Sequence, residues 1–391
     1  MSPSDHAIAI TPDEIPGVLS GGTWRRSLKR ALITWGLWRS VLSLWGYALW
    51  RTGLIRPDAG REWLHGLVPA IEGVRAAWVD IWLRWDTVHY LRIIQFGYGP
   101  DERSAFFPLY PLLGKVFGVL TGGDYLLALL LVSNLAAIGC FYALDQLAQI
   151  QTPDPKQNRI LHNLAFYPAA FFLLVAYPQS LVLFFVLAAY LAQRRQRLFL
   201  TFVFGFAAGL THSTALPLTI LLFLGAFGFK RQRWLWFWTA CAPLLGIAGF
   251  LVWRYTAGFP SFPELLMSIW GKNVGPGVDF AGGMTSLIWL IRGWPNLVVL
   301  LLGLGTLYWG FKNRRFAWVG FQAVVLLIPI LTGQAAAPLE GMARYALVAF
   351  PIYFAISSWL PKGWKRLVIL TFAIGGNLYL SGLFILWGFV G

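Results

Sequence analysis

Charged residues are scarce in this chain. They make up 12% of its 391 residues, whereas soluble domains carry roughly 25%. Hydrophobic residues account for 58%, and the mean hydropathy is +0.63. Apolar runs such as 32–50 and 367–390 are about long enough to cross the hydrocarbon core of a bilayer. The shortage of charge excludes an ordinary soluble domain, and the sequence predicts a protein that crosses a membrane several times.

Cysteine and the common cofactor motifs are equally scarce. The two cysteines, Cys140 and Cys241, both fall in apolar segments, which excludes a disulfide framework. The five histidines form no HxxxH or HExxH pair, so we expect no metal site. No Walker loop or dinucleotide fingerprint is present, and the glycine-rich stretch 275–283 lacks the strand–helix context of such motifs. We therefore expect neither nucleotide chemistry nor a cofactor.

Acidic residues are half as numerous as basic ones, 16 against 31, which leaves a net charge of +15. The basic residues gather in short clusters between apolar runs, at 25–30, 194–197, 230–233, 312–315 and 362–366. That pattern is typical of cytoplasmic loops and not of a nucleic-acid-binding face. We expect no nucleic-acid partner and a cytoplasmic N-terminus. The first 24 residues lack the apolar core of a signal peptide, so the first membrane helix is expected to direct insertion.

Placing every basic cluster in the cytoplasm predicts an all-α protein with about eleven membrane crossings. Two apolar stretches, 160–193 and 198–229, each have basic clusters on both sides, so each is predicted to cross twice as two short helices. Turns are expected at 176–180 and 211–217, where proline, serine and threonine permit a break. Segment 104–121 is interpreted as an amphipathic or re-entrant helix on the outer face, because a crossing there would invert everything downstream.

This topology divides the chain into a cytoplasmic segment, 1–30, and one transmembrane domain, 31–391. The longer crossings are predicted at 31–51, 124–148, 234–253, 287–311 and 316–333, with two more flanking the cluster 362–366. Three external loops result, at about 52–123, 254–286 and 333–344. All three lie on the same side of the membrane, so their polar residues are expected to meet there.

The external loops and turns contain the unusual polar residues of the chain. The first loop holds Arg84, Asp86, His89, Arg92, Asp101 and Glu102, the second Arg254, Tyr255, Lys272 and Asp279, the third Glu340, Arg344 and Tyr345, and the turns Gln179 and His212. A cavity with one carboxylate and several cations suits an anionic substrate and an acceptor that must lose a proton. Asp86 and His89 would share one face of a helix.

Each of these residues also has a simpler interpretation. A loop carboxylate such as Asp86 is often solvated or paired with an arginine, and a histidine such as His89 often lies at the membrane interface. Arg344 and Tyr345 could equally form an interfacial anchor. Gln179, His212 and Arg254 could be ordinary polar residues at helix ends. Arg39 and Asp145, within or near crossings, are further candidates for functional groups.

Three stretches carry a family resemblance. WDTVHY (85–90), the following Gly97-Tyr98, and AFFPLYP (105–111) resemble the signature of PIG-V-like mannosyltransferases. This family includes GPI mannosyltransferase 2 and bacterial relatives. RYALVAFP (344–351) resembles its second signature. The resemblance implies a GT-C-type membrane glycosyltransferase that uses a polyprenyl-phosphate sugar, favours mannose, and needs no metal.

The resemblance also implies roles for individual residues. Asp86 would be the general base, and the sugar would pass with inversion to an acceptor hydroxyl on the extracytoplasmic face. Arg344, Arg254 or His89 would lie near the departing phosphate. The other expected substrate-binding residues are Arg84, Tyr90, Gln179, His212 and Tyr345. The location expected is a bacterial plasma membrane, because long eukaryotic-style loops are missing.

Two positions depart from the family pattern and keep other functions open. Gln179 stands where a glutamate is usual, and His212 where an arginine is frequent. These departures favour a changed donor or acceptor, or a non-catalytic member that acts as the partner of another membrane enzyme. A lipid or sugar transporter is a third possibility, but it predicts internal repeats and ionisable groups near the midplane, which the sequence does not show.

Overall fold

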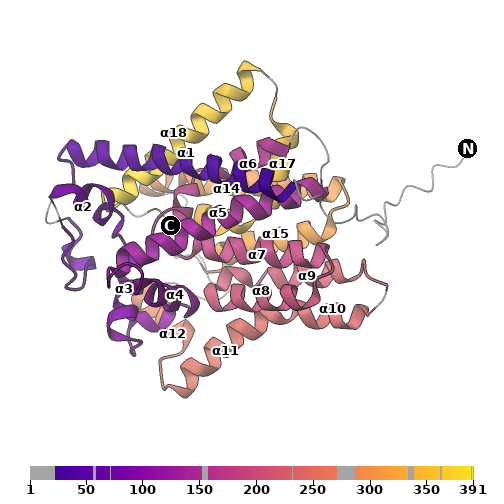
Figure 1. The fold of residues 1–391 in the computed structure, drawn as a ribbon, viewed down its shortest axis with the longest axis horizontal. Helices are drawn as coiled ribbons and strands as arrows, with labels where there is room; N and C mark the ends of the chain where they lie inside the picture. The colour runs from indigo at the N-terminus through magenta and orange to yellow at the C-terminus, as the bar shows by residue number, and fades with distance from the viewer. Residues whose placement is uncertain are drawn as a thin grey trace, which may run out of the picture.

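A computed structural model of the protein describes residues 23–55, 59–70, 72–151, 157–230, 232–270, 287–332, 339–361, 363–388 and 390. Every regular element within these ranges is a helix. The longest are α1 (Thr23–Arg51), α5 (Tyr125–Gln151), α14 (Leu287–Lys312) and α18 (Trp364–Ile385). Most helices run along the long axis of the molecule (Figure 1). Helix α1 contacts both α5 and α18, and the bundle confirms the predicted all-α fold for the described residues.

Four helical segments are long and apolar enough to cross a membrane by length and composition: Tyr125–Gln151, Arg233–Thr256, Gly293–Lys312 and Trp364–Ile385. Four shorter apolar helical segments accompany them, at Gln179–Arg194, Leu198–Thr211, Ser213–Ala226 and Phe316–Leu331. The predicted count of about eleven crossings is therefore not confirmed. Helix α1 has the necessary length but not the hydropathy, since tryptophans and Arg39 interrupt its apolar residues. It begins at Thr23, inside the segment expected to precede the first crossing.

The structure breaks both long apolar stretches at the predicted turns, but it also breaks the first one earlier, after residue 165, so no continuous helix fills 160–175. The first forms α6 (Gln157–Ala165), η5 (Ala170–Leu173) and α7 (Gln179–Arg194). The second forms α8 (Leu198–Thr211), η6 (Ser213–Ala215) and α9 (Leu218–Ala226). Pro178 and Pro217 directly precede α7 and α9. Proline begins a helix readily but interrupts one from within, because its ring blocks the preceding turn and it lacks an N–H group.

Segment 104–121 does not form a long helix. It contains the end of η4 (Glu102–Ala105) and α4 (Leu109–Gly118). A ten-residue helix is about 15 Å long, which is half the thickness of the hydrocarbon core. Neither helix is long enough to span the hydrocarbon core by itself, and the place of the segment relative to the membrane stays a prediction.

Helix α11 (Ala242–Thr256) follows α10 (Arg233–Ala240) and packs tightly against α8. A Cβ atom at Gly209 would lie 2.2 Å from the backbone oxygen of Pro243, and one at Gly246 would lie 2.4 Å from that of Phe206. The two glycines therefore let the backbones approach, as small residues do between membrane helices. This packing fixes the ends of α8 and α11, where His212 and Arg254 lie.

The last part of the chain is more broken than expected. One helix was predicted between the loop 333–344 and the basic cluster 362–366. The structure instead has α16 (Met342–Tyr345), η7 (Ala346–Val348) and α17 (Pro351–Trp359), which follow α15 (Phe316–Leu331). Pro351 begins α17 because a proline cannot continue the preceding helix. The short α16 places Arg344 and Tyr345 on a separate turn.

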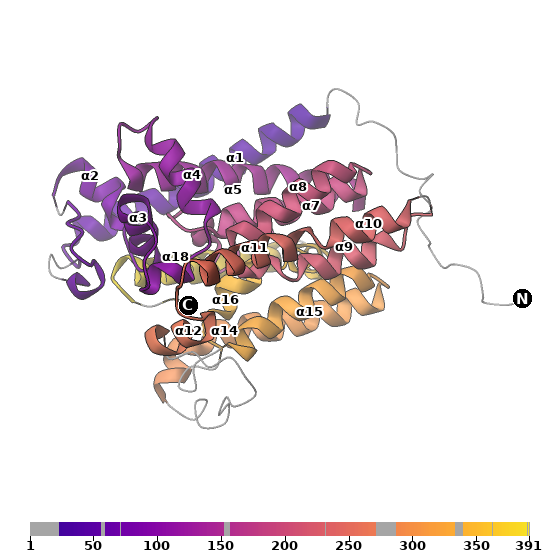
Figure 2. The same cartoon turned by 90° about the horizontal axis from the view of Figure 1, so that it is seen from below.

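Short elements gather at one end of the bundle, which we call the loop end (residues 59–118). They are η2 (Arg61–Trp63), α2 (Gly73–Trp78), η3 (Asp80–Trp82), α3 (Asp86–Phe96), η4 and α4. Helix α12 (Phe262–Trp270) lies at the same end and contacts η4, whereas α9 and α10 lie at the opposite end (Figures 1 and 2). The predicted first and second external loops thus meet at one end of the molecule. Lys272 and Asp279 lie outside the described residues.

Candidate active site

Asp86 is the first residue of α3, and the preceding turn is held by contacts with the segment before α7. The backbone N–H of Asp86 donates a hydrogen bond to the Tyr177 hydroxyl, 3.0 Å away. The Thr87 hydroxyl donates to the carbonyl of Ala176 at 3.1 Å. Trp85 has a φ of +51°, a sparsely populated conformation for a residue other than glycine. The turn therefore carries backbone strain, which the contacts to Ala176 and Tyr177 offset.

Arg344 forms an ion pair with Asp86, although 258 residues separate them in the sequence. Its Nη1 donates to Oδ2 of Asp86 at 2.7 Å. The side chains are 8% and 24% exposed, respectively. Burial by itself would lower the pKa of Arg344, but the Asp86 carboxylate raises it above its ordinary value. The pair joins the WDTVHY motif to the RYALVAFP motif.

Aromatic rings enclose the guanidinium of Arg344. Its central carbon lies 5.8 Å from the ring centroid of Phe172, 5.9 Å from that of Tyr177, and 5.3 Å from that of Tyr345. Such faces attract a cation while excluding water. The rings therefore hold Arg344 in place beside Asp86.

The ion pair keeps hydrogen-bonding capacity that the described residues do not use. Nε of Arg344 is buried and has no hydrogen-bond partner in the described part of the chain. In the same part of the chain, only Oδ2 of Asp86 accepts a hydrogen bond from Arg344, and no donor reaches Oδ1. A buried guanidinium donor suits an anionic oxygen, and a partly exposed carboxylate oxygen can accept a proton. The arrangement can therefore bind an anion and deprotonate a neighbouring hydroxyl.

His212 borders the same region from the turn between α8 and α9. Its ring lies 6.0 Å from that of Tyr345 and 6.3 Å from that of Phe107, centroid to centroid. Its Nδ1 accepts a hydrogen bond from the backbone N–H of Thr214 at 3.1 Å and lies 3.0 Å from the Thr214 hydroxyl. The structure thus brings residues from the first loop, the third loop and this turn together.

Gln179 lies at the start of α7, two residues after Tyr177. It is 3% exposed, and its Oε1 has no hydrogen-bond partner among the described residues. The hydroxyl of the next residue, Ser180, is also buried without a partner there. Buried polar atoms normally have a partner in the protein, in ordered water or in a ligand. The start of α7 therefore has polar atoms for a bound molecule close to the turn that holds Asp86.

His89 lies one helical turn after Asp86 and faces other residues of the loop end. Its ring stacks on Phe106, with centroids 4.9 Å apart, and its Nδ1 is 3.7 Å from Oε1 of Glu102. Burial lowers the pKa of His89 to about 4, so the ring is neutral at pH 7. Tyr90 is 2% exposed and packs edge-on against Phe106 and Tyr110. Tyr90 is thus part of the core beneath the site.

Arg84 is committed to backbone carbonyls. Its Nε donates to Ile385 at 2.8 Å, and its Nη1 donates to Asp80 and Leu83. Its guanidinium carbon also lies 4.8 Å from the Trp387 ring centroid. Burial lowers the pKa of Arg84 to about 9. This arginine ties the turn before α3 to the end of α18, which is a structural role the sequence did not indicate.

Arg254 ends α11 and holds the start of the second loop. Its Nη2 donates to the carbonyl of Pro260 at 2.9 Å, and its guanidinium carbon lies 5.2 Å from the Phe262 ring. The structure ties this residue to its own loop and not to Asp86. Arg39 and Asp145 are likewise bonded to partners other than Asp86. Arg39 donates to the carbonyl of Leu174, and Asp145 pairs with Arg30 at 3.3 Å.

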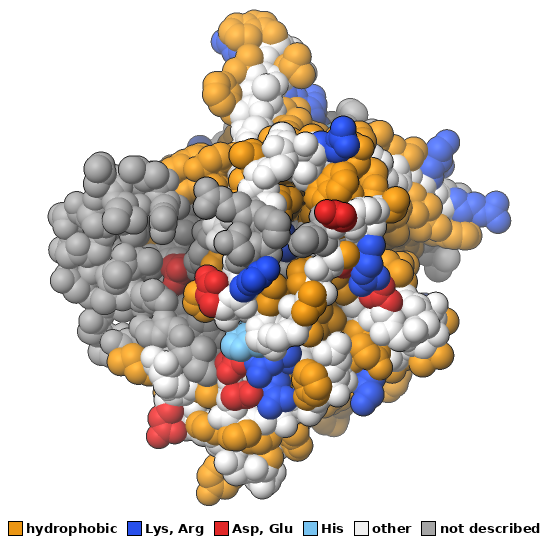
Figure 3. All heavy atoms as spheres, turned by 90° about the vertical axis from the view of Figure 1, so that its left-hand side faces the viewer, with side chains coloured by type: hydrophobic (Ala, Val, Ile, Leu, Met, Phe, Trp, Pro, Cys, Tyr) orange, Lys and Arg blue, Asp and Glu red, His pale blue; other side chains and the backbone are white. Residues whose placement is uncertain are grey.

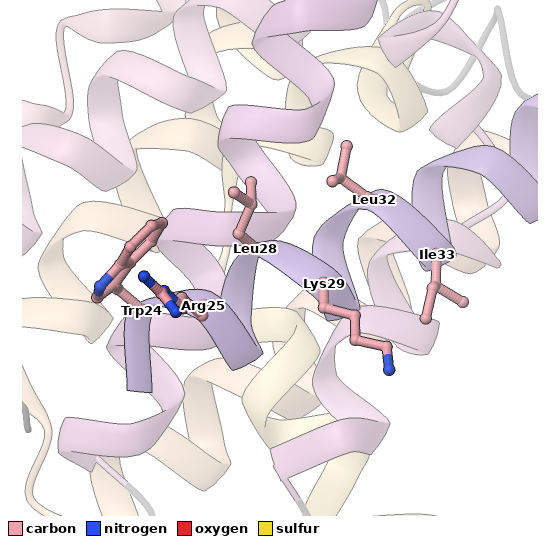
Figure 4. A pocket seen from close by; sticks show the side chains of 6 residues that line it. All are labelled: Trp24, Arg25, Leu28, Lys29, Leu32 and Ile33. Atoms are coloured by element: carbon pink, nitrogen blue, oxygen red, sulfur yellow. The ribbon is translucent and has the colours of Figure 1, made fainter. Parts of the chain in front are cut away.

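The surface of the loop end mixes both signs of charge. Acidic, basic and histidine side chains lie close together near the middle of this face (Figure 3). Two cavities lie apart from Asp86 and Arg344, the first of them at the loop end itself. One, of about 640 Å³, is lined by residues that include Arg75, Asp80 and Asp124. The other is a groove of about 400 Å³ along the outside of α1 (Figure 4), lined by Trp24, Arg25, Leu28, Lys29, Leu32 and Ile33. Neither cavity is lined by Asp86 or Arg344.

Tyr177 and Phe172 are site residues that sequence reasoning missed. The sequence feature that could have indicated them is the proline-containing turn before α7, which was expected on the same side of the membrane as Asp86. No pattern in that turn distinguishes an aromatic residue that supports an arginine from one in the core. Both rings are in fact buried, and Tyr177 also receives the hydrogen bond from Asp86.

No protein-family model and no curated protein sequence matches this chain. Among solved structures, the chain is similar to an oligosaccharyltransferase of Archaeoglobus fulgidus tethered with an acceptor peptide. The sequences are 11% identical and the TM-score is 0.43. The match covers 90% of this chain and 55% of that one, so the chain spans about half the length of the oligosaccharyltransferase.

Proposed function

We propose that the protein is a membrane glycosyltransferase of the GT-C type that moves a sugar from a polyprenyl-phosphate donor to an acceptor hydroxyl. The observation that carries this proposal is the ion pair between Asp86 and Arg344 at 2.7 Å. It joins a partly exposed carboxylate to a buried cation, and each belongs to one of the two motifs that resemble PIG-V-like mannosyltransferases. The resemblance supports mannose as the sugar and the extracytoplasmic face of a bacterial plasma membrane as the location.

In the proposed reaction, Oδ1 of Asp86 takes the proton of the acceptor hydroxyl. The acceptor oxygen attacks the anomeric carbon and forms the new glycosidic bond with inversion. The bond between that carbon and the phosphate oxygen breaks, and its electron pair leaves with the polyprenyl phosphate. A lipid phosphate is already a good leaving group, so no general acid is needed.

Arg344 is proposed to bind the phosphate as charge builds up on it. Its buried Nε supports this role, because a desolvated guanidinium donor stabilises an anionic oxygen more strongly than a solvated one. Gln179, His212 and Tyr345 are proposed to contact the sugar or the acceptor. Asp86 and Arg344 then have separate tasks, although they form a pair when no substrate is bound.

The test is sugar transfer by the purified full-length protein in detergent or proteoliposomes, with polyprenyl-phosphate mannose as donor and a membrane-lipid extract as acceptor source. Loss of a general base typically costs about 10²–10⁴-fold in rate, and we expect that loss for Asp86→Asn. Asp124→Asn is the matched control, since Asp124 pairs with Arg75 away from Asp86. The control should keep the wild-type rate.

Three results would contradict the proposal or part of it. Equal transfer by wild type and Asp86→Asn would remove the base assignment. Movement of the lipid across proteoliposomes without any covalent product would favour a transporter instead. A wild-type protein with no transfer that co-purifies with a second membrane enzyme would favour the non-catalytic partner.

A further inference from the structure

Three potential metal ligands from different segments meet at the loop end. They are His65 in the loop after η2, His89 in α3, and Glu102 at the start of η4. Nε2 of His65 lies 3.9 Å from Oε1 of Glu102, and Nδ1 of His89 lies 3.7 Å from the same oxygen. One ligand atom from each residue can be chosen so that all three lie within 4.8 Å of one another.

These separations are close to those of ligands that share one metal ion. Zinc binds imidazole nitrogen and carboxylate oxygen at about 2.0–2.2 Å, so ligand atoms at tetrahedral angles are about 3.4 Å apart. The two measured distances exceed this value by a few tenths of an ångström. The third separation, between the two imidazole nitrogens, is at most 4.8 Å, so side-chain rotations that bring the two rings closer together would place all three atoms around one ion.

The surrounding contacts hold two of the three ligands in position. Stacking on Phe106 fixes the ring of His89. The Arg92 guanidinium forms a short hydrogen bond with Glu102, which orients that carboxylate. His65 has a φ of +46°, an uncommon backbone conformation outside glycine, and its ring centroid lies 5.7 Å from that of His89. Support of this kind is typical of metal sites, where neighbouring groups orient the ligands.

Arg92 is also the main competitor of a metal, because it already neutralises Glu102. It has a second acidic partner, however, since its Nη2 lies 3.4 Å from Oδ2 of Asp101. An ion bound by Glu102 would leave Arg92 paired with Asp101. The alternative is a plain ion-pair cluster in which the two histidines only pack, and the experiment must distinguish these two cases.

We propose that His65, His89 and Glu102 bind one divalent transition-metal ion, with zinc as the best match to two imidazoles and one carboxylate. Three protein ligands leave a fourth position for water or for a hydroxyl of a bound molecule. The site lies beside Asp86, since residues three apart on a helix are about 5–6 Å apart at Cβ. The inference goes beyond the proposed transfer reaction, which uses no metal, and it is measured without any sugar donor.

The experiment is zinc titration of the full-length protein in detergent, stripped of metal with a chelator and followed by isothermal titration calorimetry. We expect one high-affinity zinc ion per chain. His65→Ala should weaken it by about tenfold or more, which is the scale of losing an orienting or ligating group. The matched control is His162→Ala, because His162 lies on α6 and stacks on Phe166. The zinc affinity of the His162→Ala variant should equal that of the wild type.

A second measurement replaces zinc with cobalt, whose visible absorption reports a tetrahedral nitrogen–oxygen site. His89→Gln should remove this spectrum, and His162→Ala should keep it. Zinc affinity that is the same in wild type, His65→Ala and His89→Gln would overturn the proposal and support the ion-pair cluster. His65 is suited to this test because its side chain is 36% exposed, so its removal leaves the fold intact even if Glu102 variants do not fold.

Discussion

The ion pair between Asp86 and Arg344 makes a quantitative prediction about stability. A double-mutant cycle compares Asp86→Asn, Arg344→Gln and the double variant with the wild type. Each single change leaves one charge without its partner, whereas the double change leaves none. If the pair exists in solution, the decreases in the free energy of unfolding caused by the two single changes must add up to more than the decrease in the double variant.

The structure sets the size of this coupling. A hydrogen bond to a charged group contributes about 1.5–3 kcal/mol, and breaking a fully buried pair costs about 3–5 kcal/mol. Arg344 is buried, but the Asp86 side chain is 24% exposed, so water screens part of the interaction. We therefore expect a coupling of about 2 kcal/mol, below the range for a fully buried pair.

Intrinsic tryptophan fluorescence during heating measures this effect, since the chain has 21 tryptophans. At about 2.1 cal/mol/K per residue, unfolding 391 residues gives an entropy near 0.8 kcal/mol/K, so 2 kcal/mol corresponds to about 2 °C. Scan rate and detergent must be the same for all four proteins, and refolding after the scan must be verified, because a melting temperature gives a free energy only when unfolding is reversible. A coupling below about 0.5 kcal/mol, the usual deviation for independent sites, would refute the pair.

The remaining predictions concern packing, capping and hydrogen bonding. Gly246→Ala should destabilise the protein by about 1–3 kcal/mol through overpacking against α8. A Cβ atom at Gly249, in contrast, meets nothing within 4 Å. Gly249→Ala is therefore the control, and it should leave the melting temperature unchanged or raise it. Asp124→Ala should lower the free energy of unfolding by about 1 kcal/mol, because Asp124 accepts a hydrogen bond from the Leu127 N–H at the start of α5. Asp124→Asn should keep most of this helix cap. Although burial raises the pKa of Asp124, hydrogen bonds from Arg75 and Leu127 lower it overall, so its charged form stabilises the fold above pH 4 and this contribution is lost as the pH falls further. The melting temperature should therefore drop more steeply below about pH 4 in the wild type than in Asp124→Asn, and equal slopes would contradict this. Tyr177→Phe should lower stability by about 1 kcal/mol by removing the partner of the Asp86 N–H, and no loss would show that water replaces it.

Several features of the fold follow from short stretches of sequence. The apolar runs predicted membrane helices, and the prolines at 178 and 217 predicted the breaks before α7 and α9. Hydropathy and proline act through the residue itself and its nearest neighbours, so a local window contains the necessary information. The number of crossings stays a prediction, because it depends on how charge and length together decide which helices span the membrane.

The site was predicted only in part. Asp86 and Arg344 were both chosen from their motifs, but nothing in either motif states that one accepts a hydrogen bond from the other. Arg84 was chosen for its charge, and it instead holds backbone carbonyls at the end of α18. A side chain in a loop can serve a ligand or the fold, and only the packing around it decides which.

The sequence by itself predicted an all-α protein with apolar helices and the breaks in its apolar stretches, and it singled out Asp86 as a candidate. Only the tertiary structure decided that Arg344 reaches Asp86 across 258 residues, and that His65 and His89 share Glu102. The physical reason is that hydropathy is a sum over neighbouring residues, whereas an ion pair or a ligand set requires atoms a few ångströms apart. Those distances are set by the packing of the helices, which no local pattern specifies.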